Sequence, residues 1–224
     1  MIKPITRNAI FRASPIADNF IASIQQGYAN DFDLTVSKEA ATVSKYYDHL
    51  TPYHAIDDPV NNFGVLVYRT SSLKTYIEEV PGVLNQFLQT LNIKQLFVLD
   101  MLHTPFDNYP FQNFKKRNDF RRIMGRNLKN GGYLIDTGIL KKILTLFFFS
   151  GFYGRPVIFF IPADGDVSMT IHLCDDGNFH LNFQEKYASH IAEAAITAGF
   201  IMGDLDLCWD NSIYRYATKQ SVVV

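Results

Sequence analysis

Apolar residues along this chain follow a helical period in some stretches and form short strand-like runs in others. Between residues 14 and 27 they recur every three or four positions, as on one face of an amphipathic helix, and a second helix is predicted after Ser37. Farther along, apolar and β-branched runs alternate with helical stretches, which is typical of strands buried on both faces. These runs span residues 64–69, 95–100, 133–136 and 157–161.

The last third of the chain has a different pattern. Cys174-Asp175-Asp176-Gly177 predicts a hairpin turn with glycine in the left-handed conformation, and a later amphipathic helix, residues 185–198, ends at Gly199. The predicted hairpin strands span residues 167–173 and 178–183, and two final strands span residues 201–209 and 212–218. Alternating helices and buried strands that close on an antiparallel pair predict an α/β fold. We expect a wound, mostly parallel, Rossmann-like sheet with helices on both faces.

The composition fits one domain. A chain of 224 residues, 47% of them hydrophobic, can build one large core. No repeat and no Gly/Ser-rich linker divides it. We therefore expect a single α/β domain over residues 1–224, in which residues 1–60 form a helical N-terminal cap or lid.

The charges of the chain nearly balance, with 21 basic and 22 acidic residues. A net charge of −1 argues against attraction of the whole surface to nucleic acid or to an anionic membrane, so neither is expected as a partner. One basic segment runs from Lys115 to Lys129. It is interpreted as the solvated face of a helix, and a phosphate-bearing partner is the alternative.

The most hydrophobic stretch, residues 139–161, contains three basic residues and is interrupted by glycine and proline. It therefore predicts two core elements and not a membrane-spanning helix. Its aromatic part, from Phe147 to Phe152, is a candidate contact for a homo-oligomer. Because the N-terminus lacks the apolar stretch of a signal peptide, we expect a cytoplasmic protein.

The chain has two cysteines, Cys174 and Cys208, which are too few for a disulfide framework. We interpret both as buried thiols in a reducing compartment. His172 and His180 lie on opposite arms of the predicted hairpin, where they can face each other. A soft-metal site beside Cys174 would need further ligands that the spacing does not supply, so no metal is expected.

Three stretches resemble the C-terminal half of class I S-adenosylmethionine-dependent methyltransferases. They are LFVLDMLH (residues 96–103), FRRIMGRNLKNGGYLI (residues 120–135) and AEAAITAGF (residues 192–200). A weaker match, YYDHLTPY (residues 46–53), is similar to the N-terminal lid of small-molecule methyltransferases. The resemblance implies S-adenosylmethionine as cofactor. However, the chain has no glycine-rich cofactor turn before Leu96, so no cofactor-binding residues are assigned.

Two ionisable residues, Asp100 and His103, lie where a buried strand is predicted to end. Open α/β sheets hold their ligands at such strand ends. His103 titrates near neutrality and suits a general base, so the pair is the candidate for proton transfer. Alternatively, Asp100 caps a loop and His103 is a surface residue.

The tyrosine-rich segment is the candidate substrate site. Tyr46, Tyr47, His49 and Tyr53 are predicted to line it, as a lid over an apolar or aromatic ligand. The alternative is that the tyrosines pack on the core with their hydroxyls in water.

These observations support two hypotheses from different classes. The first is a methyltransferase-like domain that binds or modifies a small apolar or aromatic molecule. The second is a non-catalytic, degenerate form of that fold that works as a binding or assembly subunit with a protein partner. The aromatic share, 14%, suits a pocket and an interface equally. Whether the protein is an enzyme therefore stays open in the sequence, and a transferase is the activity expected if it is one.

Overall fold

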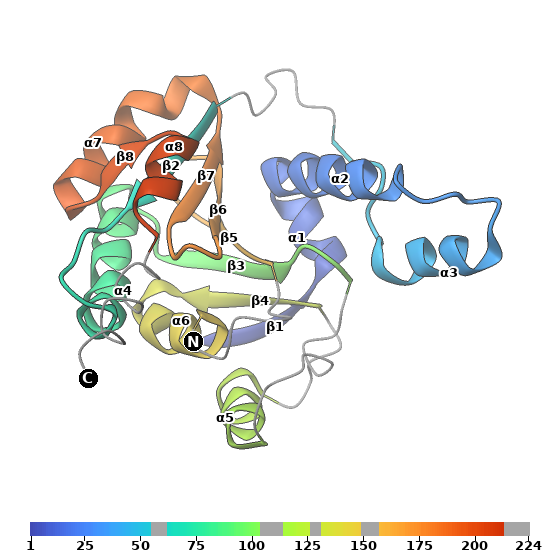
Figure 1. Cartoon of the computed structure of the whole chain (residues 1–224), viewed down its shortest axis with the longest axis horizontal. Coiled ribbons are helices and arrows are strands. Elements are labelled where there is room, and N and C mark those ends of the chain that lie inside the picture. Colours follow the sequence, from blue (N-terminus) through green and yellow to red (C-terminus); the bar gives the residue numbers. More distant parts are fainter. Residues whose placement is uncertain (55–61, 104–113, 126–130, 149–156, 213–224) are drawn as a thin grey trace, which may run out of the picture.

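A single eight-stranded sheet organises the computed structural model, which describes residues 1–54, 62–103, 114–125, 131–148 and 157–212 (Figure 1). The strands lie in the order β1-β4-β3-β5-β6-β7-β2-β8, and every neighbouring pair is antiparallel. The strands are β1 Ile2–Thr6, β2 Asn62–Val67, β3 Gln95–Asp100, β4 Gly131–Asp136, β5 Ile158–Pro162, β6 Met169–Leu173, β7 Phe179–Phe183 and β8 Ile201–Gly203. The α-helices are α1 Arg7–Ala13, α2 Pro15–Ala29, α3 Ser37–Tyr46, α4 Leu73–Thr90, α5 Phe114–Met124, α6 Leu140–Phe148, α7 Ala188–Ala198 and α8 Leu205–Asp210.

The antiparallel pairing shows that the predicted parallel, Rossmann-like sheet is wrong. Strand β3 pairs with β4 on one side and β5 on the other, antiparallel in both cases. Between β3 and β4 the chain passes through α5, which packs against α6 below the sheet in Figure 1, and it returns in the opposite direction. A continuous apolar run indicates that both faces of a strand are buried, but it does not indicate whether the neighbouring strands are parallel or antiparallel.

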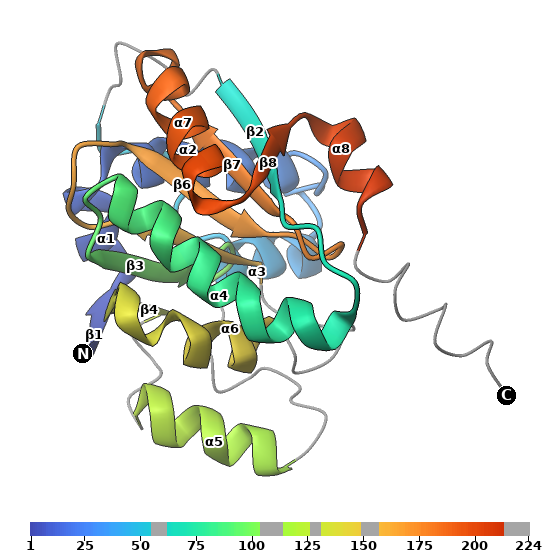
Figure 2. The ribbon, with the colours of Figure 1, turned by 90° about the vertical axis from the view of Figure 1, so that its left-hand side faces the viewer.

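The first face of the sheet carries the main core. Helices α4, α6 and α7 cover it, and they lie in front of the strands in Figure 2. Strand β3 contributes Leu96 and Val98 to this side, and its alternate residues Phe97 and Leu99 point to the other side. Helices on both sides therefore account for the unbroken apolar run of β3 without any parallel partner.

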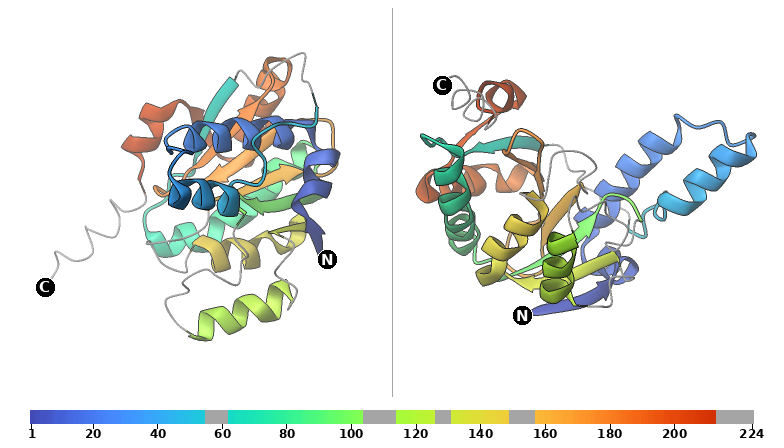
Figure 3. Two further views of the ribbon diagram at one scale, coloured as in Figure 1. Left: turned by 90° about the vertical axis from the view of Figure 1, so that its right-hand side faces the viewer. Right: turned by 60° about the horizontal axis from the view of Figure 1, so that its bottom comes forward.

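The second face is covered in two separate parts. Helices α1 and α2 pack over β3 and β5 through Ile10, Phe11 and Ile21, and Figure 3 shows α2 lying across this side of the sheet. At the other edge α8 packs on β2, and Cys208 belongs to the same buried cluster as Val65 and Val67 of that strand. Strands β6 and β7 lie between these two parts. This arrangement positions the candidate site described below.

Both ends of the described chain differ from the sequence-based prediction. Residues Ile2–Thr6 form β1, which extends the sheet beside β4, and α1 follows at once; the sequence pattern did not reveal either element. Near the other end, the strand predicted over residues 201–209 is wrong after its first three residues. Asp204 accepts a hydrogen bond from the backbone N–H of Leu207 and so caps α8.

The remaining helices and strands agree well with the prediction. Ser14 caps α2 by accepting from the backbone N–H of Ala17, and Ser72 caps α4 in the same way. The hairpin of β6 and β7 forms as expected, with Gly177 at φ 86°. The described part of the basic segment belongs to α5, on which Arg122 pairs with Asp119 at 3.0 Å, and residues 126–129 of that segment lie outside the described residues.

Three further predictions concern the domain division, the aromatic contact and a membrane-spanning helix. The division into one domain with a cap over residues 1–60 stays a prediction. The candidate contact from Phe147 to Phe152 lies outside the described residues apart from the backbone of its first two positions in α6. Among the helices of the described chain, none is both long enough and apolar enough to cross a membrane.

Candidate functional site

A cavity of about 530 Å³ opens on the second face of the sheet, between α2 and the strands β5, β6, β7 and β2. Its volume falls within the range of small-molecule sites, roughly 300–1,000 Å³. Among the described residues, six aromatic side chains contribute to its lining: Phe20, Tyr28, Phe63, Phe159, His172 and His180. We call this cavity the aromatic pocket.

Helix α2 forms one wall of the aromatic pocket because of its residue spacing. Ile16 and Ile21 turn toward the sheet and fill the core. Phe20, Ile24 and Tyr28 follow one another every four positions and line the pocket instead. The helical face recognised in the sequence is therefore shared between core and cavity.

The floor of the pocket carries a polar strip. His180 and Asn182 alternate along β7, so both point to the same side of the sheet, and His172 comes from β6. His172 lies directly opposite His180 in the register, with ring centroids 5.9 Å apart and nearly perpendicular planes. The predicted cross-strand histidine pair is thus confirmed. Asn182 lies 3.4 Å from the Thr170 hydroxyl, to which its amide donates.

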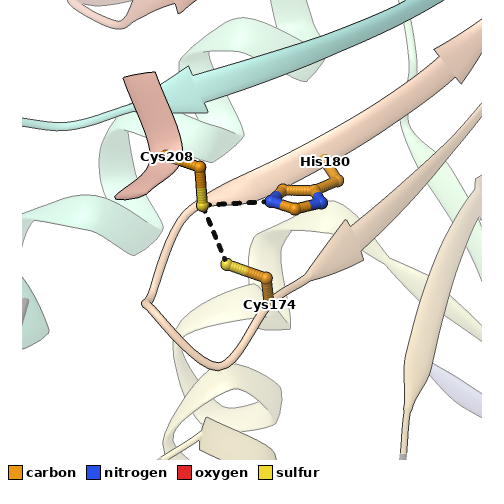
Figure 4. A group of neighbouring side chains, drawn as sticks. All are labelled: Cys174, His180 and Cys208. Carbon is orange, nitrogen blue, oxygen red and sulfur yellow. Dashed lines mark hydrogen bonds between the residues drawn. The ribbon is translucent and has the colours of Figure 1, made fainter. Parts of the chain in front are cut away.

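His180 also belongs to a second group of side chains, the Cys-His-Cys cluster, which consists of Cys174, His180 and Cys208 (Figure 4). The Sγ atoms of the two cysteines lie 3.7 Å apart, and Nε2 of His180 lies 3.2 Å from Sγ of Cys208. Both cysteines are buried and carry free thiols. The hairpin turn supplies Cys174, β7 supplies His180, and α8 supplies Cys208.

Burial favours the neutral forms of Cys174 and His180. Burial, together with the neighbouring Cys208 thiol, raises the pKa of Cys174 to about 12. Burial also lowers the pKa of His180, although Asp176 acts in the opposite direction. Sequence reasoning placed Cys174 near the histidine pair and interpreted Cys208 as a buried thiol, but it did not bring Cys208 to this cluster. Cys208 lies 34 residues from Cys174 in a segment predicted to be a strand. No spacing signal links these two cysteines.

Charged residues gather behind the pocket around Arg7, which is 2% exposed. Arg7 donates from Nε and Nη2 to the Asp48 carboxylate at 2.8 and 3.0 Å, and its Nη1 donates to the main-chain carbonyl of Asp100. Gln25 joins this group by donating to Asp48 and to the carbonyl of Met101 at 2.7 Å. The side chain of Met101 lines the aromatic pocket, so this charged cluster forms part of the support behind it.

The two carboxylates beside Arg7 differ in their titration. Burial would raise the pKa of Asp48, but hydrogen bonds and the positive charge of Arg7 bring it below its usual value. Burial dominates at Asp100 and raises its pKa to about 7, although Arg7 and three backbone N–H groups oppose this. Asp100 is therefore an acid that titrates near neutral pH, a property often found at functional sites.

His103 lies near the same cluster, where its charge influences Asp48. It is exposed, and its backbone N–H donates to the carbonyl of Tyr46 at 2.8 Å. Arg7 lies beside both predicted proton-transfer residues. It donates to the main-chain carbonyl of Asp100, and its side chain and the His103 ring both approach the same glycine, Gly131. The catalytic roles of Asp100 and His103 stay predictions.

The predicted substrate residues lie in a segment that is fastened to α2. His49 is buried, stacks on Phe11 with centroids 3.9 Å apart, and places Nε2 2.6 Å from Oδ1 of Asp18. Tyr53 is half exposed, and its backbone N–H donates to the same carboxylate at 3.1 Å. These contacts hold the segment against α2.

The two remaining tyrosines, Tyr46 and Tyr47, come earlier in the same segment. Tyr46 packs against the ammonium group of Lys45, and the ring centroids of Tyr47 and Phe32 lie 6.0 Å apart. Burial raises the pKa of Tyr47, with smaller effects from Tyr28 and Asp31 at the rim of the aromatic pocket. The part of the lining that the structure describes includes none of the four predicted substrate residues. Their role in binding stays a prediction, as does S-adenosylmethionine as cofactor.

Comparison of the chain with protein-family models, with curated proteins and with solved structures gives no match.

Proposed function

We propose that this protein binds a small, largely apolar molecule, and preferably an aromatic one, in the aromatic pocket. The observation that carries this proposal is the cavity of about 530 Å³ with six aromatic rings in its lining. Aromatic side chains favour offset-stacked or edge-to-face contacts with another ring, which suits a flat ligand. This retains the small-molecule part of the first sequence-based hypothesis and gives it a different location.

The architecture explains why the pocket remains open. Helices α1 and α2 cover β3 and β5, and α8 covers the opposite edge. The strip of β6 and β7 between them presents His172, His180 and Asn182 on an otherwise apolar floor. A few polar groups on an apolar surface orient a ligand and give specificity, which is the usual composition of small-molecule sites.

Gly27 offers a direct test, because it lines the pocket and a Cβ atom built there meets no atom within 4 Å. We expect Gly27→Phe to place a ring at the pocket and to weaken ligand binding at least tenfold. Since glycine is a poor helix residue, this change should not destabilise α2. Binding can be measured by saturation-transfer NMR and calorimetry with indole, naphthol and decanoate.

The matched control is Gly82→Phe, the same substitution at an exposed glycine of α4 where a Cβ atom again meets no atom within 4 Å. Helix α4 covers the first face of the sheet, away from the pocket. We expect this variant to bind the probes as the wild type does. Equal binding by wild type and Gly27→Phe, or the absence of binding by all three probes, would contradict the proposal.

A further inference from the structure

We propose that Cys174, His180 and Cys208 form a zinc site with three protein ligands, at the side of the aromatic pocket to which His180 belongs. This inference goes beyond the proposed function and does not depend on it. It contradicts the sequence-based expectation of no metal, which rested on spacing along the chain.

The distances in the Cys-His-Cys cluster agree with tetrahedral coordination. A zinc ion with Zn–S bonds of about 2.3 Å holds two sulfur atoms about 3.8 Å apart, and with a Zn–N bond of about 2.05 Å it holds sulfur and nitrogen about 3.6 Å apart. The observed separations are 3.7 Å between the two Sγ atoms and 3.2 Å between Sγ of Cys208 and Nε2 of His180. All three ligand atoms lie within 4.8 Å of one another. The two observed separations therefore lie within a few tenths of an ångström of the zinc values, and the separation between Cys174 and His180 is at most 4.8 Å.

Three different elements hold the ligands in this arrangement. His180 is fixed by the pairing of β7 with β2 and β6, and the tight hairpin turn fixes Cys174 through a backbone hydrogen bond from its N–H to the carbonyl of Asn178 at 2.9 Å. Cys208 is the fourth residue of α8, which packs on β2. A site assembled from elements that the fold already fixes has little further ordering to undergo when the metal binds.

Asn178 provides a supporting contact of the kind that metal sites use. It is 1% exposed, and its Nδ2 donates to Sγ of Cys208 at 3.3 Å and to the carbonyl of the same residue at 3.1 Å. An N–H donor on a cysteine sulfur stabilises the thiolate and orients it toward a metal.

Zinc binding at these residues needs only the metal ion and the release of two protons. Cys174 and Cys208 each release one proton to solvent as the two Zn–S bonds form, and the lone pair of Nε2 of His180 forms the third bond while its proton stays on Nδ1. The two thiolates neutralise the charge of Zn²⁺. Thiolate and imidazole ligands together favour zinc over hard cations such as magnesium or calcium.

The described residues supply three ligands, and no fourth histidine, cysteine or carboxylate among them joins the group. Three protein ligands with one position left for water or substrate are typical of catalytic zinc sites, whereas structural sites use four. Because the His180 side chain also lines the aromatic pocket, a metal at this position would bear on ligand binding there.

Cobalt(II) is the probe for this site, because tetrahedral Co²⁺ with thiolate ligands absorbs strongly in the visible region and shows a thiolate-to-cobalt charge-transfer band in the near ultraviolet. The reduced, chelator-treated full chain is titrated with Co²⁺ and then with Zn²⁺. We expect one Co²⁺ per chain, both absorption features, and displacement of Co²⁺ by one equivalent of Zn²⁺. Zinc should also protect both cysteines from alkylation, as read by mass spectrometry.

Single substitutions test whether the metal is bound by these three side chains and not by neighbouring residues. Cys208→Ser should lose about half of the charge-transfer intensity. His180→Gln should keep the charge-transfer band and lose affinity by more than the roughly 10–100-fold that follows removal of a supporting contact. His172→Gln is the matched control, since its ring lies beside His180 but outside the cluster, and it should keep stoichiometry and spectrum. Circular dichroism checks that each variant is folded.

Several outcomes would overturn the zinc site. They are an absence of charge transfer in the reduced wild type, cysteines that alkylate equally fast with and without zinc, and an equal loss of affinity in His172→Gln and His180→Gln. A disulfide between Cys174 and Cys208 in protein purified without added oxidant, together with no cobalt spectrum after reduction, would assign the cluster to redox chemistry instead. Because the indole and naphthol titrations are separate measurements, failure of the zinc site leaves the pocket proposal standing.

Discussion

Replacing Asp100 by asparagine should make the protein more stable at high pH. Asp100 is 4% exposed at the end of β3, and burial raises its pKa from 3.8 to about 7. Asparagine has nearly the same size and keeps an oxygen that can accept from the neighbouring backbone N–H groups, but it carries no charge at any pH. The substitution therefore removes the cost of ionising a buried acid without creating a cavity.

The sign and size of the effect follow from proton linkage. A group whose pKa is higher in the folded state than in the unfolded state binds more protons when folded, so the unfolding free energy falls as pH rises through the interval between the two values. For Asp100 this interval runs from 3.8 to about 7. A shift of roughly three pH units at 1.36 kcal/mol per unit gives about 4 kcal/mol as an upper value.

Urea unfolding at several pH values between 4 and 8 measures this effect, and the quantity to plot is the unfolding free energy of the variant minus that of the wild type. We expect the difference to grow with pH by up to about 4 kcal/mol in favour of Asp100→Asn. The subtraction matters because the lowered pKa of His180 makes wild-type stability rise with pH in the same range. The lowered pKa of Asp48 affects the unfolding free energy only at lower pH, where stability is lost as the Asp48 carboxylate is protonated.

A difference that stays flat, or that shrinks as pH rises, would refute the reasoning, because it would show that Asp100 ionises as easily in the folded protein as in the unfolded chain. An equal m-value for both proteins is required for the comparison to hold. The measurement also bears on the predicted proton-transfer role of Asp100, since general acid–base catalysis works best with a pKa near the working pH.

Two other substitutions test how the N-terminal segment is held on the sheet. Asp18→Ala should lower the unfolding free energy by about 3–5 kcal/mol in urea, because the buried carboxylate lies 2.6 Å from the ring of His49 and 2.9 Å from that of His54, and its removal leaves buried polar groups unpaired. Gly131→Ala should lower the melting temperature, since Gly131 has φ 70° and a Cβ atom there would lie 2.7 Å from Cδ of Arg7.

Each of these two substitutions has a control. Asp18→Asn keeps an acceptor oxygen for part of the same network and should cost less than Asp18→Ala; equal losses would show that hydrogen bonding at Asp18 contributes little. Gly138→Ala changes a glycine where a Cβ atom meets no atom within 4 Å and should leave the melting temperature nearly unchanged. An unchanged melting temperature in Gly131→Ala would mean that Arg7 can move away without cost.

Local structure was largely predictable from the sequence because its causes are local. Ser14 and Ser72 cap helices, Gly177 and Gly199 occupy left-handed positions, and apolar spacing identifies α2 and α7. The histidine pair on the hairpin was also predictable, because a tight turn fixes which residues of its two strands face each other.

The site shows the limit of that local information. Cys174 and His180 belong to one hairpin, but Cys208 reaches them only because α8 folds back onto β2. Likewise, Asp48 and Asp100 meet at Arg7 from distant parts of the chain. These contacts depend on long-range packing, for which one sequence carries no local signal.

The sequence by itself determined where most helices and strands form, that the central strands are buried on both faces, and that aromatic residues are abundant enough to line a pocket. Only the tertiary structure decided the direction of the strands, the place of β1 at the edge of the sheet, and the gap between α2 and α8 on its second face. The physical reason is that propensity and periodicity act over a few residues, whereas strand direction and cavities are set by how whole elements pack against one another.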